Sequence, residues 1–215
     1  MITLYHAFNA RSFRPLWALE AIGLSYELKM LPFPPRALAK DYLQINPLGT
    51  IPAFHDGATR MTESAAICQF LADRYDAGAI GVRQDEADYG AYLNWLHFGE
   101  ATLTFPQTLV LRYRRLEPEA RRLPQAADDY AKWFLARARA VGPALERDYI
   151  CADRFTAADI SMGYAFMLAG LIGLGDDLPA PAKAYWGRLQ SHPSFARAMA
   201  AQTAAADAQG VGKGW

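Results

Sequence analysis

The pattern of apolar and polar positions in the first part of the chain predicts alternating strands and helices. Apolar runs at residues 2–6 and 26–31 are typical of short strands, and residues 13–23 between them carry apolar side chains at helical spacing. Gly23 is a natural end for that helix. A strand, a helix and a strand in this order predict a parallel crossover unit.

A hairpin between two further helices is predicted next. Residues 37–45 and 64–75 have helical patterns, and the runs at 51–55 and 59–62 between them are short enough for strands. The turn Asp56-Gly57 separates these two runs, which is a strong hairpin signal.

The rest of the chain is predicted to be helical. Residues 86–113 form one long pattern with a kink or break at Pro106. Residues 126–149 form another, which is either one long helix or a helix with a bend at Gly142-Pro143. Shorter helices are predicted over 181–190 and from 193 to about 202, and the glycine-rich tail from 210 is predicted to be irregular. We therefore expect one domain over residues 1–77, a linker over 78–85 and an all-helical domain over 86–215.

Another helix start is predicted at residues 155–160. Thr156 can cap the backbone N–H three residues on, and Asp159 can reach back to the N-cap, while Phe155 and Ile160 can form a hydrophobic staple. We interpret this element as structural.

Composition narrows the function classes. The chain has 215 residues with 52% hydrophobic and 20% charged residues and a formal net charge of zero. No basic stripe indicates a nucleic-acid partner, and no apolar run is long enough to span a bilayer. Cys68 and Cys151 are far apart and form no metal motif, so we expect buried reduced thiols and no bound metal. The first residues lack a signal-peptide pattern, which favours a cytoplasmic location.

The most informative stretch runs from Asn46 to Ser64. It combines the turn Asn46-Pro47-Leu48-Gly49, a proline at the start of a strand, and Glu63-Ser64 at the start of a helix. A cis Ile51–Pro52 bond would leave the backbone of Ile51 available to a peptide ligand, and a helix N-terminus attracts a carboxylate.

In these motifs, N-P-L-G-T-I-P and E-S-A-A-I, the chain resembles the cytosolic glutathione S-transferase family of bacterial type. The resemblance implies a thioredoxin-like α/β N-terminal domain, with a mixed four-stranded sheet and three helices, followed by an all-α C-terminal domain. It also implies that glutathione binds at Thr50, Ile51, Pro52, Glu63 and Ser64. The residue before the proline would pair with the cysteinyl backbone, and Glu63-Ser64 would hold the γ-glutamyl end.

Glutathione chemistry requires a thiolate. A free thiol has a pKa of about 8.5, and lowering it by about two units requires roughly 2.7 kcal/mol. A helix N-terminus supplies about 0.3–1 kcal/mol, up to about 2, and a hydrogen bond to the charged sulfur about 1.5–3 kcal/mol. Together they suffice, so the sequence should place a donor in the loop before the first helix.

Four residues are candidates for this role. In the register of the resembled family, the catalytic Ser or Cys of several classes corresponds to Asn9, whose amide can donate a hydrogen bond but cannot remove a proton. Ser12 has suitable chemistry and is also a natural N-cap. Arg11 adds positive charge, and Tyr5 is where the tyrosine-type classes carry their donor, although a strand tyrosine is more often part of the core. We rank Asn9 and Ser12 level, Arg11 next and Tyr5 last.

The favoured function is a glutathione transferase that activates glutathione, its co-substrate, for attack on a small apolar electrophile without a further cofactor. Helical phase after the linker suggests Trp95 and four further residues for the electrophile pocket: Phe98, Thr102, Phe105 and Tyr113. The resemblance also implies a homodimer. Two alternatives stay open: a glutathione-dependent peroxidase or disulfide reductase, and a non-catalytic binding module that kept the fold.

Overall fold

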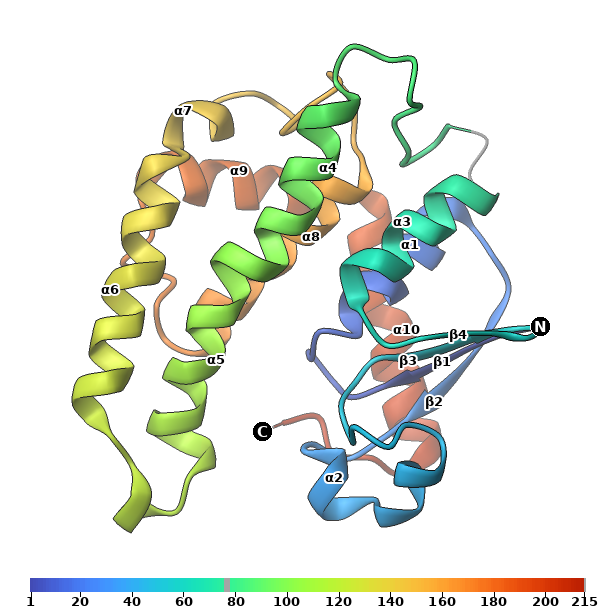
Figure 1. The fold of residues 1–215 in the computed structure, drawn as a ribbon, viewed down its shortest axis with the longest axis vertical. Coiled ribbons are helices and arrows are strands. Elements are labelled where there is room, and N and C mark those ends of the chain that lie inside the picture. The colour runs from blue at the N-terminus through green and yellow to red at the C-terminus, as the bar shows by residue number, and fades with distance from the viewer. Residues whose placement is uncertain (76–77, 215) are drawn as a thin grey trace. The chain divides into compact units, whose positions relative to one another are not determined.

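The computed structural model describes residues 1–75 and 78–214. Its contacts divide the chain into two compact units, one of Met1–Gly81 with Ser191–Trp215 and one of Val82–Gln190. The strands, all in the first unit, are β1 (Ile2–His6), β2 (Tyr26–Met30), β3 (Ala53–Asp56) and β4 (Thr59–Met61). The longer helices of that unit are α1 (Phe13–Ile22), α3 (Ser64–Tyr75) and α10 (Pro193–Gln209) (Figure 1).

The sheet has the order β2-β1-β3-β4. β1 runs parallel to β2 and antiparallel to β3, and β4 pairs antiparallel with β3 across the predicted turn. Leu4 lies opposite Phe54 and both are fully buried, whereas Tyr5 lies opposite Ala53 on the other face. The mixed four-stranded sheet and the crossover predicted from the sequence are therefore confirmed.

The predicted helix over residues 37–45 is wrong as a single element. Two short pieces replace it: α2 (Pro35–Leu38) and the 3₁₀ turn η1 (Lys40–Gln44). Ala39 between them has φ −137° and ψ 73°, which is not a helical conformation, so the helix cannot continue through it.

Helix α10 packs against α1 and β2 within the first unit. The indole N–H of Trp17 on α1 donates to the Ser194 hydroxyl at 2.8 Å, and the rings of Trp17 and Phe195 lie 5.0 Å apart. Near the other end of α10, Gln209 accepts from the backbone N–H of Met30 and donates to the carbonyl of Leu28, both at 2.8 Å. The predicted domain boundaries stay predictions, but the last helix makes its contacts with α1 and β2.

The second unit consists of helices. α4 (Tyr89–Phe98) continues through a π-helical turn, η2 (Gly99–Thr104), into α5 (Phe105–Leu111), so the regular helix is interrupted just before Pro106 as predicted. Gly99 is required there, because a Cβ on it would lie 2.5 Å from the Ser161 hydroxyl. The remaining elements are η3 (Arg112–Leu116), η4 (Glu119–Arg121), α6 (Pro124–Ala140), α7 (Gly142–Leu145), α8 (Ala157–Leu171) and α9 (Ala180–Gln190).

The predicted capping box at the start of α8 is confirmed. Thr156 and Asp159 exchange the two capping hydrogen bonds, and Asp159 also accepts from the backbone N–H of Ile150 at 2.9 Å and from the Tyr185 hydroxyl at 2.6 Å. Asp159 is fully buried, so these bonds provide the partners that a buried carboxyl requires. Throughout the described residues, no helix has both the length and the apolar character needed to cross a membrane.

Candidate functional site

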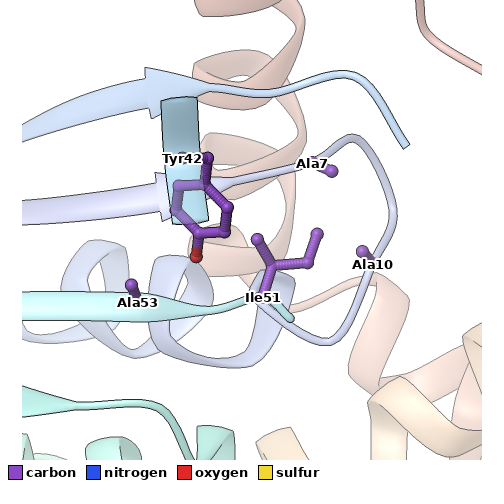
Figure 2. Packing of buried hydrophobic residues seen from close by; sticks show 5 residues of the cluster. All are labelled: Ala7, Ala10, Tyr42, Ile51 and Ala53. Atoms are coloured by element: carbon purple, nitrogen blue, oxygen red, sulfur yellow. The ribbon is translucent and has the colours of Figure 1, made fainter. Parts of the chain in front are cut away.

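The loop before α1 packs against the residue that precedes Pro52. Ala7 and Ala10 of the loop share a buried cluster with Ile51, Tyr42 and Ala53. Figure 2 shows Ala10 beside the side chain of Ile51, at the end of the strand that carries Ala53. The loop before α1 and the segment around Ile51, which are far apart in the sequence, are thereby brought together.

The turn that delivers Thr50 to this place is held by side-chain hydrogen bonds. Asn46 is buried and accepts from the backbone N–H of Leu48 at 3.1 Å, while its amide donates to the carbonyl of Thr50 at 2.7 Å. The Tyr42 hydroxyl donates to the same carbonyl at 2.7 Å. Gly49 has φ +63°, and a Cβ on it would lie 2.7 Å from the Cβ of Arg36, so no other residue fits without a shift.

Ile51 precedes the paired part of β3. The Ile51–Pro52 peptide bond is cis, as the sequence suggests. The register between β1 and β3 begins at Ala53 opposite Tyr5, so Ile51 lies outside it. Ile51 and Pro52 are buried, while Thr50 is exposed.

At the start of α3, Ser64 contacts a buried positive charge that comes from α1. Ser64 is 2% exposed, and its hydroxyl accepts from the guanidinium of Arg14 at 3.3 Å. Because a guanidinium only donates, the Ser64 proton can be directed to another acceptor. Glu63, one residue earlier, is exposed, and its carbonyl accepts from the N–H of Ile67 at 2.9 Å. Glu63 also lines a cavity of about 400 Å³ with Asn46, His55 and Arg60 among its walls.

Arg14 is a residue that the sequence analysis did not assign to the site. It is fully buried on α1 between Phe13 and Pro15, although α1 buries almost only apolar side chains. A charged residue on the inner face of an amphipathic helix was the available signal, because such a charge needs a specific partner.

One turn into α3, Cys68 is buried as well, and burial raises the pKa of its thiol to about 12 against the opposing charge of Arg14. Both cysteines are free and buried, as expected.

Ser12 occupies the N-cap position of α1, but its side chain does not cap the helix, so that prediction is wrong. Its hydroxyl instead lies 2.7 Å from Nδ1 of His6 and accepts from the backbone N–H of Ala7 at 3.3 Å. The His6 ring is held from β1 and is buried, which fixes the hydroxyl inside the protein. Asn9 lies in the same loop with φ +57°, a left-handed conformation that asparagine tolerates better than most residues. Arg11 is half-buried.

Tyr5 lies on the sheet face that η1 covers. Its ring centroid is 5.7 Å from that of Tyr42 and 5.3 Å from that of His55. The neighbouring Tyr42 is buried, and burial raises the pKa of its hydroxyl to about 12. Tyr5 thus packs with aromatic residues on this face, whereas Ser12 bonds to His6 on the opposite one.

The residues suggested for the electrophile pocket lie along α4, η2, α5 and η3. Phe98 and Thr102 line a cavity of about 400 Å³ together with Leu93, Asn94, His97 and Ala101. The Trp95 ring packs edge-on against Phe98 at 5.3 Å. Phe105 is 54% exposed, and Tyr113 lies in η3.

Comparison with known proteins shows that the chain is similar to glutathione S-transferases. Residues 1–73 match the family model described as the N-terminal domain of glutathione S-transferase. Glutathione S-transferase 3 of Schizosaccharomyces pombe is 35% identical over 103 residues, which cover 48% of this chain. A solved glutathione S-transferase structure from Actinobacillus pleuropneumoniae superimposes with a TM-score of 0.75 at 25% identity, covering 92% of this chain and 91% of the other. A glutathione transferase from Methylococcus capsulatus has a TM-score of 0.83 at 23% identity, over 94% of this chain and 99% of the other.

Residues 1–73 are similar to the N-terminal domain of glutathione S-transferase, and the fold of the chain is similar to that of solved glutathione S-transferases. Its four-stranded sheet with the helices packed on it is the thioredoxin-like part of the glutathione S-transferase fold, and the helical region follows it. The match spans 43% of the length of the first curated relative and 60% of the second. The family model covers both the loop before α1 and the segment from Asn46 to Ser64, which are the two segments that carry the candidate glutathione site.

Proposed function

We propose that this chain is a glutathione transferase that binds glutathione in its first unit and activates the thiol for attack on an apolar electrophile. The observation that carries the proposal is the packing of Ala10 against Ile51, because it places the loop that should activate sulfur beside the backbone that should hold the cysteinyl residue. Glutathione is the co-substrate, and no further cofactor is required for this reaction.

The γ-glutamyl end is proposed to bind at the start of α3. The N-terminus of α3, a helix of 12 residues, favours a carboxylate. The Ser64 hydroxyl and the buried charge of Arg14 add to that preference. Glu63 is exposed at the same place and offers a carboxylate to the ammonium group. Opposite charges at the two ends of one amino acid are thereby recognised together.

The cysteinyl backbone is proposed to pair with Ile51. Ile51 lies outside the β1–β3 register, and Asn46 and Tyr42 hold the preceding carbonyl of Thr50 in place. An extended peptide that pairs with Ile51 would then continue the sheet by a short ladder, which is a common way for proteins to bind peptides.

Activation is proposed to combine the N-terminus of α1 with a side-chain donor. These two contributions together reach the roughly 2.7 kcal/mol that a pKa decrease of about two units requires. Asn9 is the favoured donor, since the Ser12 hydroxyl is bonded to His6, and Arg11 contributes positive charge. The thiolate then forms a bond from sulfur to an electrophilic carbon, and the electron pair of the broken bond leaves with the departing group.

The test is a thiol titration followed by a comparison of two reactions. Absorbance of the bound thiolate against pH should give a pKa below that of free glutathione, and conjugation of 1-chloro-2,4-dinitrobenzene should follow the same titration. Reduction of peroxide or of a mixed disulfide without conjugation would instead support the peroxidase or reductase alternative. Binding of glutathione with an unchanged thiol pKa would support a non-catalytic module.

The surroundings of the reaction are also proposals. The cavity lined by Phe98 and Thr102 is apolar enough to favour a small apolar electrophile. The resemblance to glutathione S-transferases supports a homodimer, which sedimentation analysis would detect as twice the mass of one chain. A cytoplasmic location is supported by the two free cysteines, and fluorescence microscopy of the tagged protein would test it.

A further inference from the structure

Gln202 is a buried amide on α10. The other buried positions of this helix carry small residues, which are Ser194, Ala198 and Ala206. Gln202 is fully buried, and it contacts Asn9, which is 193 residues away in the sequence. The backbone N–H of Asn9 donates to Oε1 of Gln202 at 3.1 Å, and Nε2 of Gln202 donates to Oδ1 of Asn9 at 2.9 Å. The Gln202 amide is therefore joined to Asn9 by a clamp of two hydrogen bonds, one to its backbone and one to its side chain.

The direction of every bond in this clamp follows from one group. A backbone N–H can only donate, so the Gln202 atom that faces Asn9 N–H must be the oxygen. The other arm of the Gln202 amide is then its NH₂ group, which can only donate, so Asn9 must present its oxygen to it. A reversed Asn9 amide would place two NH₂ groups against each other.

The same logic extends to His6 and Ser12. Nε2 of His6 lies 3.0 Å from the Gln202 oxygen, so this nitrogen must carry the hydrogen. Burial lowers the pKa of His6 to about 4, so the ring is neutral near pH 7 and Nδ1 has a free electron pair. The Ser12 hydroxyl therefore donates to Nδ1, and its proton is directed into the protein. This excludes Ser12 as a donor to a ligand while His6 is neutral.

We propose, on the basis of the proposed glutathione transferase function, that Gln202 is a positioning residue that makes Asn9 a hydrogen-bond donor toward the glutathione sulfur. With its oxygen held by α10, Asn9 directs its NH₂ arm away from Gln202. An anionic sulfur is stabilised by an NH₂ group and repelled by a carbonyl oxygen, so the orientation of this one amide determines the sign of its effect on the thiol. The last helix thus sets the chemistry of a loop at the start of the chain.

The experiment compares two glutamines of α10 by titrating bound glutathione. Gln202→Met removes the clamp. Gln209→Met is the matched control, because Gln209 makes a similar pair of bonds to Met30 and Leu28 of β2. Gln202→Met should raise the pKa of the bound thiol by about one unit, so at a pH below that pKa the thiolate fraction falls about tenfold. Gln209→Met should leave the pKa of the bound thiol unchanged. Thermal melting is followed for both, so that a general loss of stability is recognised.

Two further variants test whether Gln202 acts through Asn9. In an Asn9→Ala background, Gln202→Met should cause no additional change in the thiolate fraction, since the group that it orients is already absent. Gln202→Glu keeps the shape and the acceptor oxygen but, when ionised, cannot donate to Asn9, so it should turn the Asn9 amide over and also lower the thiolate fraction. This second variant tests the role even if the methionine variant does not fold.

The proposal would be overturned if the effects of Asn9→Ala and Gln202→Met on the thiol pKa were independent. It would also be overturned if either Gln202 variant gave bound glutathione the same thiol pKa as the wild-type protein. The proposed function would stand in both cases. A wild-type protein that binds glutathione without lowering its thiol pKa would overturn the function and this role together. The nitrogen chemical shifts of His6 test the hydrogen bonds from Ser12 through His6 to Gln202 separately. A hydrogen on Nε2 of His6 supports these bonds, and a hydrogen on Nδ1 would contradict them.

Discussion

Protonation of His6 should destabilise the protein between pH 6.5 and pH 4. In the folded state the ring is fully buried, and burial lowers its pKa from 6.5 to about 4 against the opposing effect of its bonds to Gln202 and Ser12. In the unfolded chain the ring titrates near its ordinary value. The unfolded state therefore binds more protons in this window, so stability is fully present above about pH 6.5 and is lost as the pH falls toward 4.

The magnitude follows from the size of the pKa difference. A decrease from 6.5 to about 4 corresponds to about 3 kcal/mol of folding free energy. That is a substantial part of the stability of an ordinary domain, which is about 5–15 kcal/mol. There is also a structural reason for the loss: a protonated ring carries a hydrogen on Nδ1, so the Ser12 proton loses its acceptor.

The perturbation is His6→Asn, which removes the titrating ring and keeps a donor and an acceptor. Urea unfolding of the two proteins, followed by circular dichroism and tryptophan fluorescence, gives the free energy of unfolding at several pH values. Acidic residues titrate in both proteins, so the difference between the two curves isolates His6. The wild-type protein should lose about 3 kcal/mol more than the variant between pH 6.5 and pH 4.

His192→Asn is the control. His192 is half-buried, and burial lowers its pKa too, so its removal should change the slope in the same direction by a smaller amount. Parallel curves for wild type and His6→Asn would refute the reasoning, because they would mean that His6 binds protons equally in both states.

The remaining predictions concern the site and the α8 cap. Glu63→Ala and Ser64→Ala should each weaken binding to immobilised glutathione. Glu63→Ala should leave the melting temperature within a few degrees, whereas Ser64→Ala should also lower it, because it removes a partner of the buried Arg14. Unchanged retention of both variants would contradict the γ-glutamyl assignment. Asn9→Ala should raise the pKa of bound glutathione by about one to two units, or roughly 1.4–2.7 kcal/mol, whereas Ser12→Ala should lower stability and leave that pKa nearly unchanged. The reverse result in the thiolate titration would make Ser12 the donor. Asp159→Ala should reduce the free energy of unfolding by about 3 kcal/mol or more, because it strands several buried donors, and a normal denaturation curve would show that these donors find other partners.

Features with local causes were predictable from the sequence. The hairpin around Asp56-Gly57 and the cap formed by Thr156 and Asp159 depend on residues within a few positions of each other, and both are present. The resemblance carried by the segment from Asn46 to Ser64 likewise rests on turn and capping residues that act over short distances. The resemblance to glutathione S-transferases and the thioredoxin-like sheet followed from these signals.

Tertiary structure decided the roles of individual polar side chains. Ser12 and Asn9 were ranked level from the sequence, since both have suitable chemistry in the same loop. Only folding brings Gln202 to Asn9 and His6 to Ser12, and buried polar groups must find partners wherever the fold provides them. Arg14 contacts the candidate site for the same reason, through Ser64, which is 50 residues away. Local sequence preferences extend over a few residues, whereas the hydrogen bonds that orient this loop connect the two ends of the chain.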